Sequence, residues 1–423
     1  MKQPKRWRTL DNAAKLFPPT SSKHDSRVFR VACELKEEVD PAELQLALDK
    51  TMELFPFYRA VMKQGLFWYY LEDSDLPIIV TGEKTHPCTP LYSRNKKKLL
   101  FEVTYYRRRI NLEVYHVLSD GTGALQFLRT MVLFYLQKKH NLYQDEQLHL
   151  DYDAAQSERN FDSFSQYFLP ERLIKKRKVP KSYKIKGDKL PPGRTCVIEA
   201  LMSAKQIREA AKTHGATITE FLTTIFVMAI GDGVALQHRN LPVTIGVPVN
   251  LRQYFHSRSA RNFFSVINVS CQLGEHIVFD DILEQVRKAF ADELTEDKIR
   301  TRMNTFASLE HNLAMKVVPL ALKDPIMGAV AKYADRRVTA GLSNVGRIDL
   351  PEVASKHIRL IDAFNSTRNL QMLIVSYLDN FIINFTSIFE ATDVQRRFFS
   401  RLVEQGISCE ISTNWIDEQA QRT

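Results

Sequence analysis

The sequence has few cysteines, and none of them is arranged as a metal or disulfide motif. Its five cysteines, an odd number, lie far apart, and no two form a Cys-x-x-Cys pair. This spacing argues against a disulfide framework and against a zinc site, so we expect no metal. It is typical of a reducing compartment, and we expect the protein in the cytoplasm.

Long apolar runs are also absent. The longest largely apolar stretch, Phe221–Ile230, is about half of the ~20 residues that a membrane-spanning helix needs. It therefore predicts a buried helix and no transmembrane segment. The charged start of the chain, Met1–Arg8, has no apolar segment behind it, which is unlike a secretory signal.

A broad basic face is lacking as well, although the net charge is +10. The stretch Glu171–Arg194 contains ten Lys or Arg against two acidic residues, so the rest of the chain is near +2. No aromatic and basic recognition motif is visible, and we expect no nucleic-acid partner. The basic stretch is either a solvated linker or a landing site for a phosphorylated substrate or an acidic protein.

The chain is long enough for two domains. Its 423 residues exceed the ~250–300 at which single cores stop growing, and its 44% hydrophobic content is that of a globular protein. Helical and alternating patterns occur in both halves, so we predict an α/β (α+β) architecture of mixed sheets and helices. We place an N-terminal domain at 1–150, a basic crossover linker at 151–194 and a C-terminal domain at 195–423.

Apolar periodicity predicts the individual elements. Strands are expected at Arg27–Leu35, Val61–Leu71, Ile78–Val80, Leu99–Tyr106, Ile110–Val117, Thr195–Met202, Val243–Val249, Phe263–Cys271, Thr339–Ser343 and Met372–Phe389. Helices are expected at Pro41–Phe55, Gly123–Lys138, Ser203–His214, Glu220–Ile230, Phe279–Leu294, within Asn304–Tyr333 and at Val394–Glu404.

One stretch combines a histidine, an aspartate and two glycines between a strand and a helix. Along Ile110–His116, alternate residues are apolar and His116 ends this buried stripe. Histidine can accept and release a proton near neutral pH, because its unperturbed pKa is ~6.5. Asp120, Gly121 and Gly123 then lead into a helix, whose N-terminal N–H groups favour negative charge. A packed core histidine is the alternative explanation.

The segment Tyr115–Gly121 resembles the HHxxxDG motif of the acyltransferase superfamily that includes chloramphenicol acetyltransferase, condensation domains, polyketide-associated acyltransferases and alcohol acetyltransferases. The resemblance covers most of the chain and is closest to the bacterial alcohol acetyltransferase-like and polyketide-associated members. Its further segments are Asp40–Arg59, Gly246–Arg252, Asn262–Phe264 and Leu342–Gly346. The sequence departs from the motif at Tyr115, which replaces the first histidine and faces away from His116 by alternation.

The resemblance implies two chloramphenicol-acetyltransferase-like domains with an active-site tunnel at their interface. It implies an acyltransferase that moves an acyl group from acyl-CoA, a co-substrate, to a small alcohol or amine. His116 would be its general base. No acyl-enzyme and no permanently bound cofactor are required.

The resemblance also implies roles for other residues. Asp120 and Gly121 would shape the motif, and Asp120 would pair with an arginine, for which Arg252 is the candidate. An oxyanion needs donors placed where charge develops, and Gly121, Gly123, Ser343 and Asn344 are candidates. Arg252 could instead be a surface or linker arginine, and Ser343–Gly346 an ordinary turn.

Two other functions stay open. The first is condensation-type ester or amide formation with a donor on an acyl carrier protein, which the basic linker could bind. The second is a catalytically silent interaction protein of the same fold. Intact His116 and Asp120 argue against the second, and the lack of an attached carrier domain argues against the first.

Overall fold

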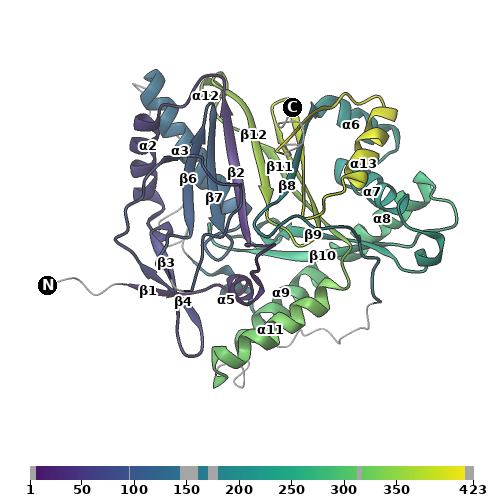
Figure 1. Ribbon diagram of the computed structural model, residues 1–423, viewed down its shortest axis with the longest axis horizontal. Coiled ribbons are helices and arrows are strands. Elements are labelled where there is room, and N and C mark those ends of the chain that lie inside the picture. The colour runs from purple at the N-terminus through teal and green to yellow at the C-terminus, as the bar shows by residue number, and fades with distance from the viewer. Residues whose placement is uncertain (1–5, 95, 143–160, 170–179, 312–316, 415–423) are drawn as a thin grey trace.

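The computed structural model describes residues 6–94, 96–142, 161–169, 180–311 and 317–414 (Figure 1). The predicted linker lies partly outside this range, at 151–160 and 170–179. Two large sheets with helices against them form the molecule, and each has its own apolar core. The fold is the mixed α/β arrangement that the sequence predicts.

The first large sheet has five strands in the order β12-β2-β7-β6-β5. Only the β5–β6 pair is parallel. These strands are β2 (Val28–Leu35), β5 (Thr81–Gly82), β6 (Phe101–Tyr106), β7 (Arg109–Tyr115) and β12 (Ile358–Asn365). A smaller sheet contains β1 (Trp7–Thr9), β3 (Ala60–Gln64) and β4 (Tyr69–Asp73).

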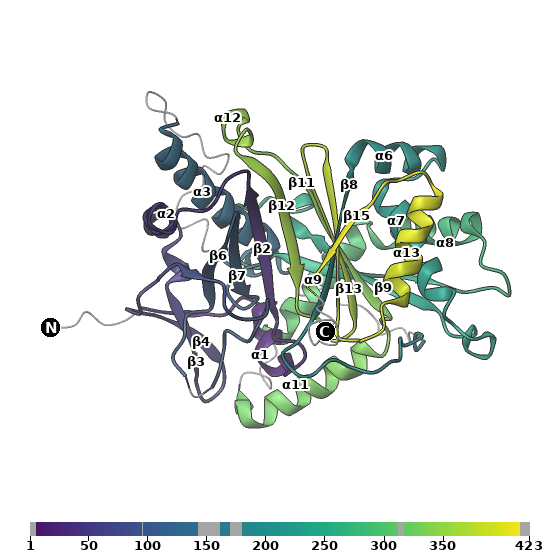
Figure 2. The same ribbon diagram turned by 45° about the horizontal axis from the view of Figure 1, so that its top comes forward.

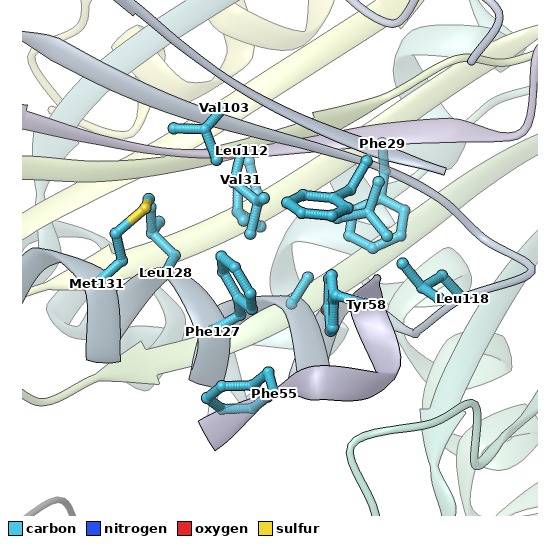
Figure 3. Packing of buried hydrophobic residues seen from close by; sticks show 14 of the residues in the cluster. Phe29, Val31, Phe55, Tyr58, Val103, Leu112, Leu118, Phe127, Leu128 and Met131 are labelled. Atoms are coloured by element: carbon cyan, nitrogen blue, oxygen red, sulfur yellow. The ribbon is translucent and has the colours of Figure 1, made fainter. Parts of the chain in front are cut away.

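Helices α2 (Pro41–Leu54) and α3 (Gly121–His140) cover one face of the five-stranded sheet. Figure 3 shows Phe127 of α3 and Tyr58 packing beneath the sheet residues Val31 and Leu112. Helix α2 begins as predicted, because Asp40 accepts hydrogen bonds from the N–H groups of its first turn and Pro41 follows.

The second large sheet has seven strands in the order β10-β9-β11-β13-β14-β8-β15, and β11 is parallel to both of its neighbours. Helices α7 and α13 pack on this sheet, with Phe226 and Phe398 against Phe385. The strands are β8 (Cys196–Ser203), β9 (Val243–Asn250), β10 (Phe264–Cys271), β11 (Ala340–Ile348), β13 (Leu370–Tyr377), β14 (Asn380–Ser387) and β15 (Glu410–Thr413). The helices of this half are α6 (Ala204–Thr213), α7 (Ile218–Gly231), α8 (Phe279–Glu293), α9 (Glu296–His311), α11 (Leu320–Asp335), α12 (Glu352–Ser355) and α13 (Asp393–Glu404).

Short elements complete the fold. They are the helices α1 (Phe17–Thr20) and α5 (Ser163–Tyr167) and the 3-10 turns η1 (Ala14–Leu16), η2 (Pro56–Tyr58), η3 (Leu236–His238) and η4 (Leu251–Gln253). Among the described residues, no single helix is long and apolar enough to cross a bilayer. Helices α6 and α7 together have the length and composition of a membrane span, but their axes meet at an angle of 80°.

Three elements differ from the sequence predictions. The single strand predicted over Val61–Leu71 is a hairpin, because Gly65 N–H donates to Trp68 O and the chain turns back between β3 and β4. Residues Ile78–Val80 form no strand, because their backbone groups bond to the side chain of Gln45 on α2: Gln45 donates to Ile78 O at 3.1 Å, and Val80 N–H donates to Gln45 Oε1 at 2.8 Å. Strand β12, in contrast, was not expected. It comes from the predicted C-terminal domain yet pairs antiparallel with β2 in the five-stranded sheet (Figure 2).

Candidate active site at the junction of the two sheets

His116 directly follows β7, where both halves of the chain hold its backbone. Its N–H donates to Arg27 O at 2.9 Å, and its carbonyl accepts a hydrogen bond of 2.8 Å from the Asn262 side chain. Arg27 precedes β2, whereas Asn262 precedes β10 of the seven-stranded sheet. The histidine is therefore fixed between the two sheets.

Aromatic rings surround the imidazole of His116. Phe17 stacks on it with centroids 4.8 Å apart, Phe29 lies at 4.5 Å and Phe264 at 6.0 Å. Burial lowers the pKa of His116 from 6.5 to about 4, and the nearby Asp120 charge offsets only part of this effect. Nδ1 is buried, and no described residue gives it a hydrogen bond. The ring is therefore neutral at pH 7, and a neutral imidazole has one nitrogen lone pair that can accept a proton.

Tyr115 occupies a separate environment. Its ring stacks on Tyr92 at 5.9 Å, and its hydroxyl lies 3.0 Å from the Ser21 hydroxyl. Burial raises the pKa of Tyr115 above its usual value. The residue that departs from the motif thus has packing partners different from those of His116.

Asp120 uses its carboxylate to join the two halves. One oxygen caps α3 by accepting from Gly123 N–H at 3.0 Å. The other accepts from Arg252 Nη1 at 2.8 Å and from Phe263 N–H at 2.9 Å. The structure therefore contains the predicted pairing of Asp120 with Arg252. Among the described residues, no hydrogen bond joins Asp120 to the His116 ring.

Arg252 also organises the loop that carries Asn262. Its guanidinium donates to Ser259 O at 2.8 Å and to Arg261 O at 2.6 Å. Arginine presents five donors in a planar fork, so one side chain can bond several carbonyls and a carboxylate together. Arg252 is thus part of the domain junction and is no exposed linker residue.

The two glycines of the motif differ in their surroundings. A Cβ at Gly123 would lie 1.9 Å from Ala260 O, so the start of α3 approaches the opposite loop too closely for any side chain. A Cβ at Gly121 would meet nothing within 4 Å. The Gly123 N–H already donates to Asp120, which leaves it unavailable to an oxyanion.

Ser343 and Asn344 lie on β11, and among the described residues no hydrogen bond joins them to His116. Asn344 donates to Thr219 Oγ1 at 3.0 Å and accepts from Gly346 N–H at 2.9 Å. The register of β11 against β13 shifts at this point, so Asn344 holds a bulge. Ser343 pairs with Leu373 in β13 and is partly buried.

Sequence patterns did not indicate Asp11, Asn262 or the aromatic residues around His116. Asp11 is fully buried and accepts from Ala14 N–H at 2.7 Å and from Asn262 at 3.2 Å. Its carboxylate lies 3.5 Å from Arg261, and burial raises its pKa to about 6. Asn262 thus bridges Asp11 and the His116 carbonyl. Its place in a segment of the resemblance was the signal that could have identified it.

Three described residues could hold a metal ion by distance alone, namely Glu37, His140 and His357. His140 Nε2 lies 2.6 Å from the Glu37 carboxylate, but the two imidazoles stack with centroids 3.8 Å apart and planes 22° apart. Nearly parallel rings direct their lone pairs along separate planes, so one ion cannot lie in both. His140 ends the 20-residue helix α3, about 30 Å from the start of that helix beside His116.

Solved structures share this fold. TRI101 of F. graminearum, complexed with coenzyme A and T-2 mycotoxin, is 12% identical over 97% of this chain and 100% of its own, with a TM-score of 0.64. Polyketide synthase associated protein 5 from Mycobacterium tuberculosis is 13% identical over 93% of this chain and 96% of its own, with a TM-score of 0.59. The first condensation domain of the CDA synthetase is 13% identical over 96% of this chain and 97% of its own, also with a TM-score of 0.59.

No protein-family model and no curated protein matches the sequence. At these identities the structural neighbours show the fold alone. The chain thus shares the fold of TRI101 and of this condensation domain.

Proposed function

We propose that the protein is an acyltransferase that moves an acyl group from acyl-CoA to a small alcohol or amine, with His116 as general base. The observation that carries this proposal is a neutral, immobilised histidine at the junction of two sheets. A general base needs a fixed position and a free lone pair near the proton that it removes.

In the proposed reaction, His116 takes the proton from the acceptor hydroxyl or amine. The acceptor oxygen or nitrogen attacks the thioester carbonyl, and the C–S bond of the tetrahedral intermediate then breaks. The imidazolium returns its proton to the leaving thiolate, so the enzyme ends neutral and no acyl-enzyme forms. Gly121 N–H and Ser343 remain candidates to stabilise the oxyanion.

Asp120, Arg252 and Asn262 support this base through the backbone. Asp120 and Arg252 fix the start of α3 against the loop that ends at Asn262, and Asn262 holds the His116 carbonyl. Their proposed role is positioning: Asp120 and Arg252 act through the loop that ends at Asn262, and Asn262 holds the His116 carbonyl and also raises the pKa of the ring.

Coenzyme A is the donor that we favour, since TRI101 of F. graminearum binds it on the same fold. An acyl carrier protein is the second candidate, because condensation domains share the fold. All five cysteines are free, which fits our proposal of a cytoplasmic location.

The test measures thiol release from a panel of acyl-CoAs with several alcohols and amines. We expect His116→Ala to lower kcat by about 10²–10⁴-fold, the usual contribution of a general base, without changing the far-UV circular dichroism. The exposed His276 provides the control, and His276→Ala should keep the wild-type rate. Undiminished turnover by folded His116→Ala would falsify the mechanism. Activity only with acyl carrier protein would replace CoA as the donor.

A further inference from the structure

The outward face of α11 is a stripe of large apolar side chains. Leu322, Ile326, Val330 and Tyr333 recur at spacings of three or four residues, which places them on one side of the helix. Each is between 57% and 63% exposed. Such a stripe in a globular protein normally faces a core, and a contiguous exposed one marks an interaction site.

The side of α11 next to the stripe is fixed to the β3–β4 hairpin, which holds the stripe in its outward orientation. Lys323 is buried, donates to Phe67 O at 2.9 Å and lies 3.3 Å from the centre of the Trp68 ring. Leu320 N–H donates to Leu66 O at 2.9 Å. Figures 1 and 2 both show α11 along the lower edge of the molecule.

The tip of this hairpin extends the apolar surface. Leu66 is 68% exposed, and Phe67 beside it is also exposed. Because Leu66 is hydrogen-bonded to the first residue of α11, the tip and the stripe lie next to each other. We name Leu66, Phe67, Leu322, Ile326, Val330 and Tyr333 the apolar ridge.

The charges around the apolar ridge are asymmetric. Both carboxylates of α11 are already paired: Asp324 accepts from Tyr69 at 2.6 Å, and Asp335 accepts from Arg368 at 2.8 Å. Lys332 and Arg336 are exposed. The Arg337 guanidinium lies over the Tyr333 ring at 4.6 Å and donates to its hydroxyl at 2.8 Å. At this end of the helix, Lys332, Arg336 and Arg337 therefore outnumber the one carboxylate, Asp335, whose side chain is 44% exposed and paired with Arg368.

We propose that the apolar ridge binds the surface of a membrane that contains anionic phospholipids. A helix with an apolar face, flanking cations and an aromatic residue can lie in the interface, with its apolar side chains below the headgroups and its cations beside them. A second copy of the chain fits less well, because it would bring the same cations and a net charge of +10 against this face.

The experiment is co-sedimentation of the full-length protein with sucrose-loaded vesicles. We expect partitioning onto mixed phosphatidylcholine and phosphatidylglycerol vesicles to be at least about tenfold stronger than onto phosphatidylcholine alone, and to weaken with added salt. Ile326→Gln combined with Val330→Gln removes apolar surface without adding charge, and should lower binding by about tenfold or more.

The control is Val403→Gln on α13, since Val403 is 58% exposed on a helix away from the apolar ridge. It should bind vesicles as the wild type does. Failure of the wild type to bind either vesicle, or equal binding by the double variant and the control, would overturn the proposal. A dimer without vesicles that the double variant dissociates would assign the face to a second copy instead.

Discussion

Phe17 and Phe29 enclose the His116 ring from two elements that precede it in the chain by about a hundred residues. Removal of the imidazole from water disfavours its charged form. We therefore predict that His116 titrates near pH 4, well below its usual 6.5, in the folded protein. Histidine-selective NMR of the wild type and His116→Gln identifies its signal. A midpoint near 6.5 would contradict the buried environment described above.

The same burial makes stability depend on pH in a defined direction. The unfolded state binds a proton at His116 below about pH 6.5, whereas the folded state binds it only near pH 4, so stability falls as pH decreases between these values. The full effect is about 3 kcal/mol. Asp11 acts in the opposite direction, because its pKa is raised to about 6. Urea unfolding of the wild type and His116→Gln at pH 7.5 and pH 4.5 isolates the His116 contribution, and the wild type should lose more stability on acidification.

Asp120 offers a second prediction at this scale. One Asp120 oxygen accepts hydrogen bonds from both Arg252 and Phe263 N–H. Asp120→Asn removes the negative charge beside Arg252 and weakens this shared acceptor. Breaking a buried ion pair costs about 3–5 kcal/mol, so we expect a lower free energy of unfolding. Urea denaturation measures it. An unchanged unfolding free energy together with complete loss of turnover would instead give Asp120 a direct role in the reaction.

The sequence predicted the partners of a residue where a motif indicated them. It did not predict them where only the folding of the chain brings the residues together. The Asp120–Arg252 pairing followed from the resemblance. Asp11 and Asn262 are 251 residues apart, and nothing local to either residue indicates that they meet beside His116.

The start of α3 is held against the loop around Ala260 by contacts that leave no room for a side chain. We predict that Gly123→Ala, whose Cβ would overlap Ala260 O, lowers the free energy of unfolding by about 3 kcal/mol or more and reduces activity. Gly121 lies on the same helical turn, and a Cβ there would have no atom within 4 Å. Gly121→Ala should therefore change the free energy of unfolding by less than about 0.5 kcal/mol. Equal melting temperatures for the two variants would show that the loop can move away from α3.

Capping and periodicity made most elements predictable. Asp40, Ser203 and Thr217 cap the helices that the sequence indicated. Strand β12 was missed because a buried polar residue interrupts its apolar pattern. Its Asp362 is fully buried beside Arg109, at 3.5 Å, and burial raises its pKa to about 8. From sequence alone, an aspartate within an apolar segment indicates an exposed loop, because aspartate is rarely buried.

At the scale of the whole molecule, β2 lies between β7 and β12, and all eight of its residues are buried. We predict that the fragments 1–194 and 195–423 do not fold separately, because the first lacks β12 and leaves β2 as an exposed apolar edge. Neither fragment should show a cooperative urea transition by circular dichroism, and mixing both should restore one. Cooperative unfolding of fragment 1–194 alone would show that β12 is dispensable.

The predicted division into two domains at 151–194 stays a prediction, since the chain crosses between the sheets again at β12 and β13. A motif and apolar periodicity indicated the fold, but they could not show this second crossing. Sequence patterns report which residues are buried and leave open which sheet they join.

The short link from Asn365 at the end of β12 to Leu370 at the start of β13 has a consequence for how molecules reach His116. A rotation of one sheet against the other that keeps the β2–β12 ladder intact must be centred near this link, because β12 moves with the five-stranded sheet and β13 with the seven-stranded one. Under the proposed function, such a rotation would open the junction that holds His116 only as far as this short link and the Asp120–Arg252 pair allow.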